Sequence, residues 1–221
     1  MTYNIVEIFD SIEGEGKRAG KPATFIRLAG CNLRCTYCDT AYAFDGEFSK
    51  LNLDNIIKHI SERPYPYVTL TGGEPLCADN IDSLISALLA AGHKVNIETN
   101  GSIDISPLLH AFGSSEDLFF TMDYKLPTSG VTSQMHLPNY AKLRPQDVLK
   151  FVVGNNEDAA HMINFVKTLD IQKAQIYIGV VYKSYSLKDL VQLIIKTPEL
   201  AKATLQLQLH KIIWDPNERG V

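Results

Sequence analysis

Helical and extended patterns of apolar residues alternate along most of the chain. Helical patterns occupy five stretches, 53–61, 81–91, 105–112, 157–169 and 187–195. In the second stretch the apolar residues recur at helical spacing up to Gly92, which predicts the end of that helix. Asp79 or Asn80 is expected to cap its start.

Short runs typical of β-strands lie between these helices, at 24–28, 67–70, 94–98, 118–121, 148–153 and 175–181, and an alternating run at 204–209 suggests a late strand. Strand–helix alternation predicts parallel βαβ units. About six strands are too few for a closed eight-stranded barrel, so we expect an α/β fold with a partial, open TIM-like barrel. In such folds the chemistry gathers at the C-terminal ends of the strands. No linker, repeat or low-complexity tract interrupts residues 1–221, which predicts a single domain.

Composition narrows the classes of partner. The hydrophobic fraction of 45% and the charged fraction of 21% are ordinary for a globular protein. The formal net charge is -4 and the basic residues are scattered, so we expect no nucleic-acid partner. The first residues are too polar for a signal peptide, and no window approaches ~18 consecutive apolar residues. We therefore predict a cytoplasmic protein without a membrane span.

Three of the four cysteines are clustered directly after the expected strand 24–28. Cys31, Cys35 and Cys38 have the spacing C-x-x-x-C-x-x-C. Thiols in the cytoplasm are more often metal ligands or catalytic groups than disulfides. Three thiolates can hold three irons of a cubane and leave the fourth open, whereas ordinary electron-transfer clusters use four thiolates. The spacing favours a [4Fe–4S] cluster completed by a small molecule; a closed zinc site with Cys77 or a histidine as its last ligand is the alternative.

The cysteine spacing, with the aromatic Tyr37 before the last cysteine, resembles the signature of radical S-adenosylmethionine enzymes. The segment 69–76, which contains Gly72-Gly73-Glu74-Pro75, resembles the Gly-Gly-Glu-Pro segment of that superfamily, whose backbone holds the amino group of the cofactor. Two glycines allow the backbone to approach a ligand closely, and Pro75 fixes the direction in which the chain leaves. The resemblance implies a [4Fe–4S] cluster and S-adenosylmethionine, which together generate a 5′-deoxyadenosyl radical.

The loop before the cysteines carries Glu13 and Glu15, and the following strand carries Arg27. Carboxylates accept hydrogen bonds from amidine-like N–H groups, and arginine grips a carboxylate with a two-pronged fork. Together these residues could hold a ligand with a guanine-like face at one end and an acid at the other. The alternative is a solvated loop with Arg27 in a surface ion pair, since exposed charges usually signify little.

The segments 9–20, 23–30 and 38–40 resemble the 7-carboxy-7-deazaguanine synthase family of the queuosine and deazapurine pathway. The resemblance continues through 98–101, 123–130 and 208–211, so it covers nearly the whole chain. It implies a magnesium-dependent homodimeric lyase that converts 6-carboxy-5,6,7,8-tetrahydropterin to 7-carboxy-7-deazaguanine with loss of ammonia, and a reductant protein such as flavodoxin. Glu13 departs from the family pattern, because members more often carry glutamine there.

The resemblance also implies roles for individual residues. The cluster would be held by Cys31, Cys35 and Cys38, and Mg²⁺ by Thr40 with the substrate carboxylate, a hard cation among oxygen ligands. The residues in contact with S-adenosylmethionine would be Tyr37, Cys38, Asp39, Gly73, Asp123, Tyr124 and Lys125. The substrate would lie against Ile12, Glu13, Gly14, Glu15, Arg27, Thr71 and His210. The catalytic acid or base of the later proton transfers is not identified.

Two other functions remain open from the sequence. An activase that places a glycyl radical on a larger protein shares the cysteine spacing, but it needs an open groove for a peptide. A zinc- or iron-binding structural module would not be an enzyme at all. Cys77 is expected to be a small packed side chain, and the histidines other than His210 form no metal-spaced pair.

Overall fold

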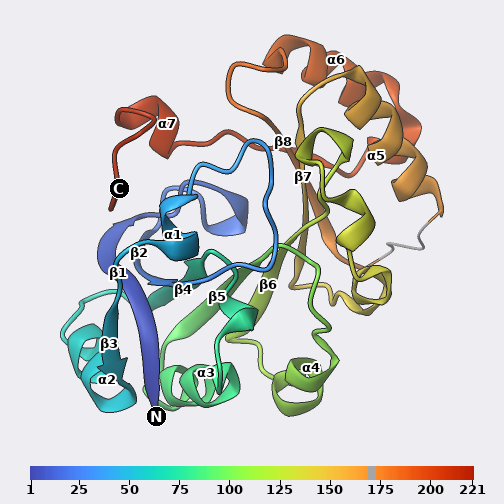
Figure 1. The fold of residues 1–221 in the computed structure, drawn as a ribbon. Helices are drawn as coiled ribbons and strands as arrows, with labels where there is room; N and C mark the ends of the chain where they lie inside the picture. The colour runs from blue at the N-terminus through green and yellow to red at the C-terminus, as the bar shows by residue number, and fades with distance from the viewer. Residues whose placement is uncertain (169–172) are drawn as a thin grey trace.

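The computed structural model describes residues 1–168 and 173–221, and its central feature is one mixed β-sheet (Figure 1). Within these residues the sheet has nine strands in the order β3-β1-β2-β4-β5-β6-β7-β8-β9. Seven of these strands form a continuous parallel series: β2 (Pro22–Leu28), β4 (Tyr67–Gly72), β5 (Lys94–Thr99), β6 (Leu118–Asp123), β7 (Val148–Val153), β8 (Gln175–Val180) and β9 (Thr204–Leu205). The end strands β3 and β9 are not paired with each other among the described residues, so the α/β barrel is open, as predicted.

Two strands that the sequence did not reveal extend the sheet beyond β2. β1 (Thr2–Ile12) pairs antiparallel with β2, and β3 (Ser49–Asn52) pairs antiparallel with β1. The ring of Phe9 on β1 stacks on Phe25 of β2 at a centroid distance of 5.0 Å. The N-terminal strand therefore lies beside the first parallel strand and contributes to the inner face of the barrel.

The five expected helices are present and lie on the outside of the curved sheet in Figure 1. They are α2 (Leu53–Ser61), α3 (Ile81–Ala90), α4 (Ser106–Phe112), α5 (Asn156–Thr168) and α6 (Leu187–Lys196). Residue 169, the last one of the helix expected at 157–169, lies outside the described residues. In α2 the buried Ile56 and Ile60 are one helical turn apart, and the Asn52 side chain caps the helix by accepting from the Asn55 N–H at 2.8 Å.

The inner face of the barrel is polar, which determines where ligands can bind. Side chains alternate along each strand. On β4, Val68 and Leu70 are buried in the hydrophobic core, whereas Thr69 and Thr71 face the other way. The same inner face carries Asn96, Glu98, Thr121, Asp123 and Lys150 from β5, β6 and β7. A barrel of this size is usually filled with branched apolar side chains, so the polar filling indicates a binding site.

The turn between β1 and β2 enters the barrel and covers the end at which the parallel strands begin, opposite their C-terminal ends. Lys17 Nζ lies 3.6 Å from the centroid of the Phe119 ring, and the Arg18 guanidinium lies 4.6 Å from that of Tyr67. Arg18 Nη1 donates to the Lys94 carbonyl at 2.9 Å, at the start of β5. Burial, with the nearby Arg18 charge, lowers the pKa of Lys17 to about 8. The turn therefore plugs the end of the barrel at which the parallel strands begin.

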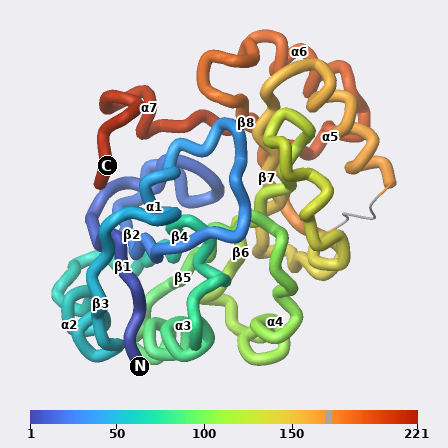
Figure 2. The backbone as a smooth tube through the Cα atoms, viewed as in Figure 1, coloured from blue at the N-terminus to red at the C-terminus, as the bar shows by residue number. Residues whose placement is uncertain are grey.

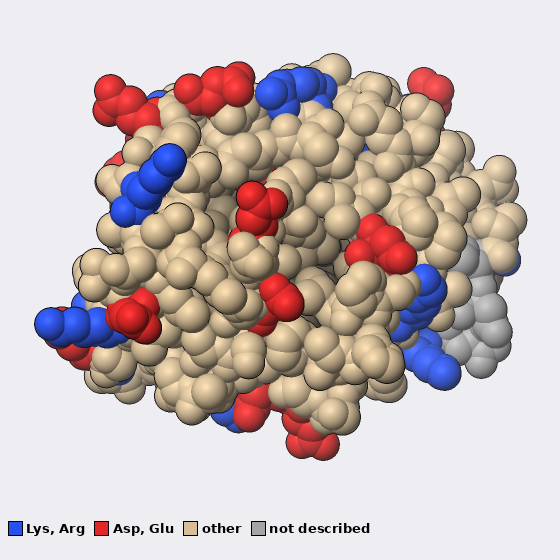
Figure 3. Space-filling view, turned by 60° about the horizontal axis from the view of Figure 1, so that its bottom comes forward, with Lys and Arg blue, Asp and Glu red and all other residues tan. Residues whose placement is uncertain are grey.

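No helix within residues 1–168 and 173–221 has the length and apolar character needed to cross a bilayer. On the face shown in Figure 3, basic and acidic side chains are interspersed, and neither kind gathers into an extended patch. The absence of a nucleic-acid partner stays a prediction.

Candidate active site

A cavity of about 770 Å³ opens at the C-terminal ends of the parallel strands. Its wall comes from the end of β1, from the cysteine loop 31–40, from β4 to β7 and from the C-terminal residues 208–221. Figure 2 shows the cysteine loop arching over the strand ends and the C-terminal segment crossing towards the β1–β2 hairpin. The volume is typical of a site for a cofactor-sized ligand, and parallel sheets bind ligands at this end.

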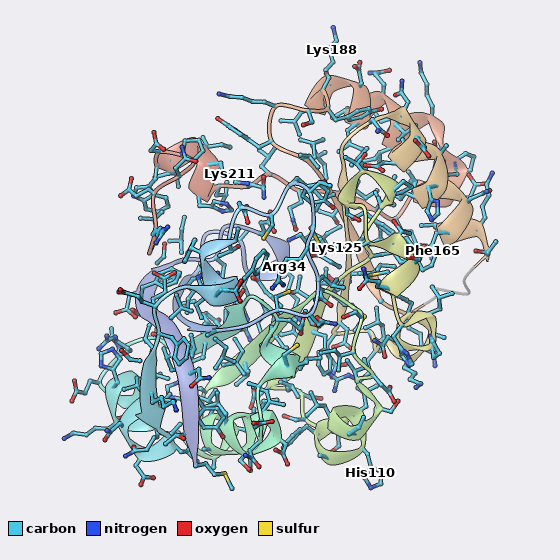
Figure 4. The ribbon with its side chains drawn as sticks, in the orientation of Figure 1. Arg34, His110, Lys125, Phe165, Lys188 and Lys211 are labelled. Carbon is cyan, nitrogen blue, oxygen red and sulfur yellow. The ribbon has the colours of Figure 1, made fainter. Side chains whose placement is uncertain are left out.

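Most of the residues singled out from the sequence meet in this cavity. The predicted residues that line it are Ile12, Gly14, Glu15, Arg27, Cys31, Cys35, Tyr37, Cys38, Asp39, Thr40, Thr71, Gly73, Asp123, Lys125 and His210. Figure 4 shows Lys125 near the centre of the molecule and Lys211 on the C-terminal segment, whereas His110 and Lys188 lie at the periphery.

Glu13 and Tyr124 are the predicted site residues that do not line the cavity. The Tyr124 ring packs in the core, 3.7 Å from the Phe165 centroid, and its hydroxyl is 3.0 Å from His161 Nε2. Glu13 is 1% exposed and accepts a hydrogen bond from the Thr69 hydroxyl, below the cavity floor. Tyr124 points away from the cavity that its neighbours Asp123 and Lys125 line, whereas the orientation of Glu13 follows from the way its loop enters the barrel.

The cysteine loop is fastened to neighbouring loops at both ends. The Gly30 N–H donates to Ala43 at 2.8 Å, which closes the base of the loop. Further along, the Thr36 hydroxyl donates to the Thr128 carbonyl at 2.6 Å. Asp158, buried at the start of α5, in turn accepts from the Thr128 N–H at 2.9 Å. The positions of the three thiols are thus fixed by hydrogen bonds between their loop and the rest of the barrel, rather than by the loop alone.

The chemistry of the three thiols fits a [4Fe–4S] cluster. All are free and half-buried, and burial raises the pKa of Cys35 and Cys38, so binding as thiolates would release protons. Cys31 Sγ accepts N–H hydrogen bonds from Leu33 at 3.4 Å and from the Asn100 amide at 3.8 Å, and hydrogen bonds to the sulfurs are one of the factors that set the reduction potential of a cluster.

Among the described residues no three His, Cys, Asp or Glu side chains are close enough to hold one metal ion. This argues against the closed zinc site, in which four ligands surround a single ion. A cubane is different, because each thiolate binds its own iron. Cys77 is exposed rather than packed as expected. The Tyr37 hydroxyl is buried beside the thiols without a hydrogen-bond partner in the described part of the chain, which leaves it available to a ligand.

Gly73 is needed because two loops meet there. A Cβ atom on this residue would lie 2.1 Å from the Gly30 carbonyl oxygen and 2.8 Å from Cys31 Cβ. Gly72 has a φ of +146°, and its Cβ would lie 2.2 Å from the Leu28 carbonyl oxygen. The two glycines therefore let the end of β4 touch the cysteine loop, with the Gly73 backbone at the cavity wall.

Glu74 joins the ends of β4 and β5 beneath the cysteines. It is fully buried, and its carboxylate accepts from the Thr99 hydroxyl at 2.8 Å, the Asn100 N–H at 2.6 Å and the Leu76 N–H at 3.1 Å. Burial raises the pKa of Glu74 to about 7, against the opposing effect of these hydrogen bonds. Asn100, which contacts Cys31, is thereby held in place.

Glu74→Ala should lower the free energy of unfolding by about 3 kcal/mol, because the Thr99 hydroxyl and the Asn100 N–H lose their buried partner. Chemical denaturation of the two proteins measures the difference. Glu62→Ala, at an exposed position, is the matched control and should change stability by less than about 0.5 kcal/mol. Equal effects of the two substitutions would contradict the role assigned to Glu74.

A chain of alternating charges crosses the cavity floor. Lys125 Nζ lies 2.7 Å from Asp123 Oδ2, and Lys150 Nζ lies 3.8 Å from Asp123 Oδ1 while pairing directly with Glu15. Burial opposes the charged form of each group, but the paired charges outweigh it, lowering the pKa of Asp123 and raising those of Lys125 and Lys150. All three therefore stay charged and offer donors and acceptors to a polar ligand.

Arg27 lies on the wall in an ion pair, but this pair is not at the surface. Its Nε atom is 2.6 Å from Glu7 Oε1, its cross-strand partner on β1, and the arginine side chain is 14% exposed. Glu7 also accepts from the Tyr42 hydroxyl at 2.8 Å. Among the described residues the terminal amino groups of Arg27 have no hydrogen-bond partner, so they can still bind an acid.

The C-terminal segment forms the remaining wall. The Leu209 N–H donates to Gly14 at 3.0 Å, and the His210 ring lies so close to Gly14 that a Cβ there would be 2.4 Å from Nδ1. Lys211 Nζ is 2.7 Å from Asp39 Oδ2. Burial alone would raise the pKa of Asp39, but the Lys211 charge lowers it to about 2. Residues from the two ends of the chain thus enclose one side of the cavity.

The cavity is also lined by charged residues that were not predicted as site residues, among them Lys150, Glu98 and Lys211. Lys150 is the one charged residue of β7, and Glu98 follows the neutral run Val95–Ile97 of β5, where a charge is unusual. That interruption is a signal in the sequence that could have revealed both residues. Lys211 has no such signal, because it follows the last strand.

Comparison with known proteins identifies the family. The radical SAM superfamily matches residues 25–112. The chain is 41% identical to the 7-carboxy-7-deazaguanine synthase of Clostridium acetobutylicum, covering 100% of both proteins. It is 36% identical to that of Methanospirillum hungatei, covering 96% of this chain and 86% of the relative. Against that of Chlorobaculum tepidum the identity is 34%, over 99% and 97% of the two chains.

Solved structures show the same fold. The crystal structure of QueE from Escherichia coli matches with a TM-score of 0.75 at 23% identity, covering 94% of each chain. The structure of Streptococcus suis SuiB bound to S-adenosylmethionine matches with a TM-score of 0.54 at 17% identity, over 80% of this chain and 44% of that one. Together with the cysteine loop and the open barrel, these findings show that the chain belongs to the 7-carboxy-7-deazaguanine synthase family of radical SAM enzymes.

Proposed function

We propose that this protein is a carbon–nitrogen lyase that converts 6-carboxy-5,6,7,8-tetrahydropterin to 7-carboxy-7-deazaguanine with loss of ammonia, in queuosine or deazapurine biosynthesis. The observation that carries the proposal is that three free cysteines and the polar inner face of the barrel meet in one cavity. The name of the full-length relative from Clostridium acetobutylicum supports the same product.

The side of the cavity near the cysteines suits the cofactors. Cys31, Cys35 and Cys38 would hold the [4Fe–4S] cluster, with S-adenosylmethionine on the open iron. When bound, these groups supply radical abstraction of a hydrogen atom from the substrate. The residues proposed to hold S-adenosylmethionine are Tyr37, Asp39, Gly73, Asp123 and Lys125. The Lys125–Asp123 pair offers both charges to the two ionic ends of its methionine part.

The opposite side suits a carboxylated pterin. Glu15 can accept from the amidine-like N–H groups of the ring, while the free amino groups of Arg27 can bind the acid. Ile12, Gly14 and Thr71 complete this side of the cavity. His210 stands at its edge, where burial lowers its pKa and keeps the ring neutral, so that it can donate or accept. Residues 215–221 line the cavity as well.

The magnesium site is proposed at Thr40. Its hydroxyl donates to Asp39 Oδ1 at 3.0 Å, and both residues face the cavity. The Thr40 oxygen leaves further positions for water and for the substrate carboxylate, as Mg²⁺ prefers. The ion would orient the substrate and neutralise its acid.

Thr40→Ala should raise the Mg²⁺ concentration that gives half-maximal rate by about 10-fold, because one oxygen ligand is lost. Magnesium titration of the reaction measures this value, and Thr204→Ala on the exposed edge strand is the control. Identical titrations for Thr40→Ala and the parent protein would place the ion elsewhere.

The reaction itself is tested by anaerobic incubation of the reconstituted protein with S-adenosylmethionine, Mg²⁺, a reductant and 6-carboxytetrahydropterin. Mass spectrometry should detect 7-carboxy-7-deazaguanine and 5′-deoxyadenosine. Release of 5′-deoxyadenosine without the deazaguanine would support the proposed radical chemistry but contradict the proposed pterin substrate. Formation of the deazaguanine by the isolated protein, without any partner protein, would exclude a glycyl-radical activase.

Three features of the proposed function concern its setting. A reductant protein such as flavodoxin would deliver electrons, the protein would act as a homodimer, and it would work in the cytoplasm. The reductant is tested by replacing a chemical reductant with flavodoxin and its reductase. Light scattering of the reconstituted protein tests the homodimer, and fractionation of cells tests the cytoplasmic location.

A further inference from the structure

Glu13 is a buried acid that the proposed function leaves unused. Its side chain lies one layer below the cavity and accepts a hydrogen bond from Thr69, whereas Thr71, two positions further along β4, donates to Glu98 at 3.0 Å in the cavity wall. The carboxyl groups of Glu13 and Glu98 therefore lie one above the other inside the barrel, each bound to a threonine of β4. Glu13 is 1% exposed, so water cannot solvate a charge there.

No cation forms an ion pair with Glu13 among the described residues. The charged groups that face it are Glu98 on β5, Glu15 on its own loop and Arg18 in the turn below. Arg18 donates to the Lys94 carbonyl and lies over two aromatic rings. Lys150 is committed to Glu15 and Asp123. A buried carboxyl group with two acidic neighbours and no ion-paired cation is favoured in its neutral form.

The titration of Glu13 agrees with this geometry. Burial, and then the Glu98 charge, raise its pKa from the ordinary 4.5 to about 8, while the Thr69 hydrogen bond and Arg18 act in the opposite direction. The group is therefore neutral at pH 7, where it resembles the uncharged side chain of glutamine.

Glu13 also stands at the base of the loop that reaches the cavity. Its N–H donates to Lys21 and its carbonyl accepts from Gly20, both at 2.8 Å, which closes the base of the turn. The next residues, Gly14 and Glu15, line the cavity. The Glu13 side chain therefore fastens from below the same loop that Leu209 contacts from above.

We propose that Glu13 is a positioning residue that acts as a neutral carboxylic acid, and that loss of its proton loosens the loop and weakens substrate binding. The part concerning substrate rests on the proposed function. The part concerning the proton does not, because it can be measured without turnover.

The first test compares the melting temperature of the reconstituted protein with that of Glu13→Gln across pH. Since the folded protein holds a proton that the unfolded chain releases above the ordinary pKa of 4.5, the parent loses stability as pH rises from there to about 8. Glu13→Gln has no such loss. The two should melt together near pH 4.5, and the variant should melt at least ~5 °C higher near pH 8.

The control is Glu62→Gln, at an exposed position, whose melting temperature should follow the parent at every pH. A gap between Glu13→Gln and the parent that stays constant from about pH 5 to pH 8 would overturn the neutral acid, because an ionised group gives no slope in that window.

The second test follows KM for 6-carboxytetrahydropterin. In the parent KM should rise about 10-fold from pH 7 to pH 9 with little change in kcat, whereas in Glu13→Gln it should stay flat. Parallel KM profiles, despite a melting gap that widens with pH, would overturn the positioning role. Absence of product at every pH would overturn the proposed function instead, and the melting curves would still decide whether Glu13 is neutral.

Discussion

Replacing Cys35 with alanine should abolish both the cluster and product formation. Two thiolates cannot hold a cubane whose fourth iron already lacks a protein ligand, so the iron content should fall well below about four per chain. The rate should fall to that of the uncatalysed reaction, a loss of at least about 10⁶-fold. Iron analysis and the visible spectrum measure the cluster content, and mass spectrometry of the reaction measures the rate.

Cys77→Ala is the matched control, because Cys77 is also free but exposed and does not line the cavity. This variant should keep its iron and its rate. Full iron and turnover in Cys35→Ala would refute the assignment of the ligands. Loss of iron in Cys77→Ala would show instead that the site is closed by four thiolates, as in electron-transfer proteins or zinc sites.

Replacing Lys150 with methionine should destabilise the protein by about 3–5 kcal/mol, because a buried pair loses one member and the other is left without compensation. Glu15 and Asp123 both depend on Lys150, whose side chain is 14% exposed. Methionine keeps the length and apolar stem of the side chain, so the change removes mainly the charge. Denaturant unfolding measures the difference.

Lys142→Met is the control, since Lys142 also contacts an aspartate, Asp104, but its side chain is 39% exposed. Surface pairs contribute at most about 1 kcal/mol, so this variant should remain near the parent. If Lys150→Met unfolds like Lys142→Met, the charge network on the cavity floor contributes no more than a surface pair. Recovery of stability in Lys150→Met at low pH, where Asp123 gains a proton, would support the network.

The elements of the parallel barrel could be predicted because each is long enough to show its own period. All six expected parallel strands and all five helices are present, most within one or two residues of their expected bounds. β1 was missed because a register shift between Ile5 and Glu7 interrupts its alternation, and β3 because it is a short edge strand with an exposed pattern. Antiparallel pairing at the edge therefore depends on tertiary contacts.

The candidate site was less predictable on its substrate side than at the cysteines. A short spacing within one loop specifies the thiols, and the two glycines near Glu74 are required by contacts with that loop. The ion pair of Arg27 with Glu7, in contrast, depends on the register of two strands. The inward turn of Glu13 depends on how its loop enters the barrel, which no local pattern encodes.

The hydrogen bond between Leu209 and Gly14 joins residues that are synthesised far apart in time. Chains emerge from the ribosome from the N-terminus onwards, at about 5–20 residues per second. The cysteine loop and β4 are therefore outside the ribosome for several seconds before residues 208–221 appear. During that interval the thiols face an incomplete cavity that is open on the side later covered by the C-terminal segment. A nascent chain that has emerged only up to residue 207 therefore has a cavity that is wide open on this side, and residues 208–221 narrow it when they follow.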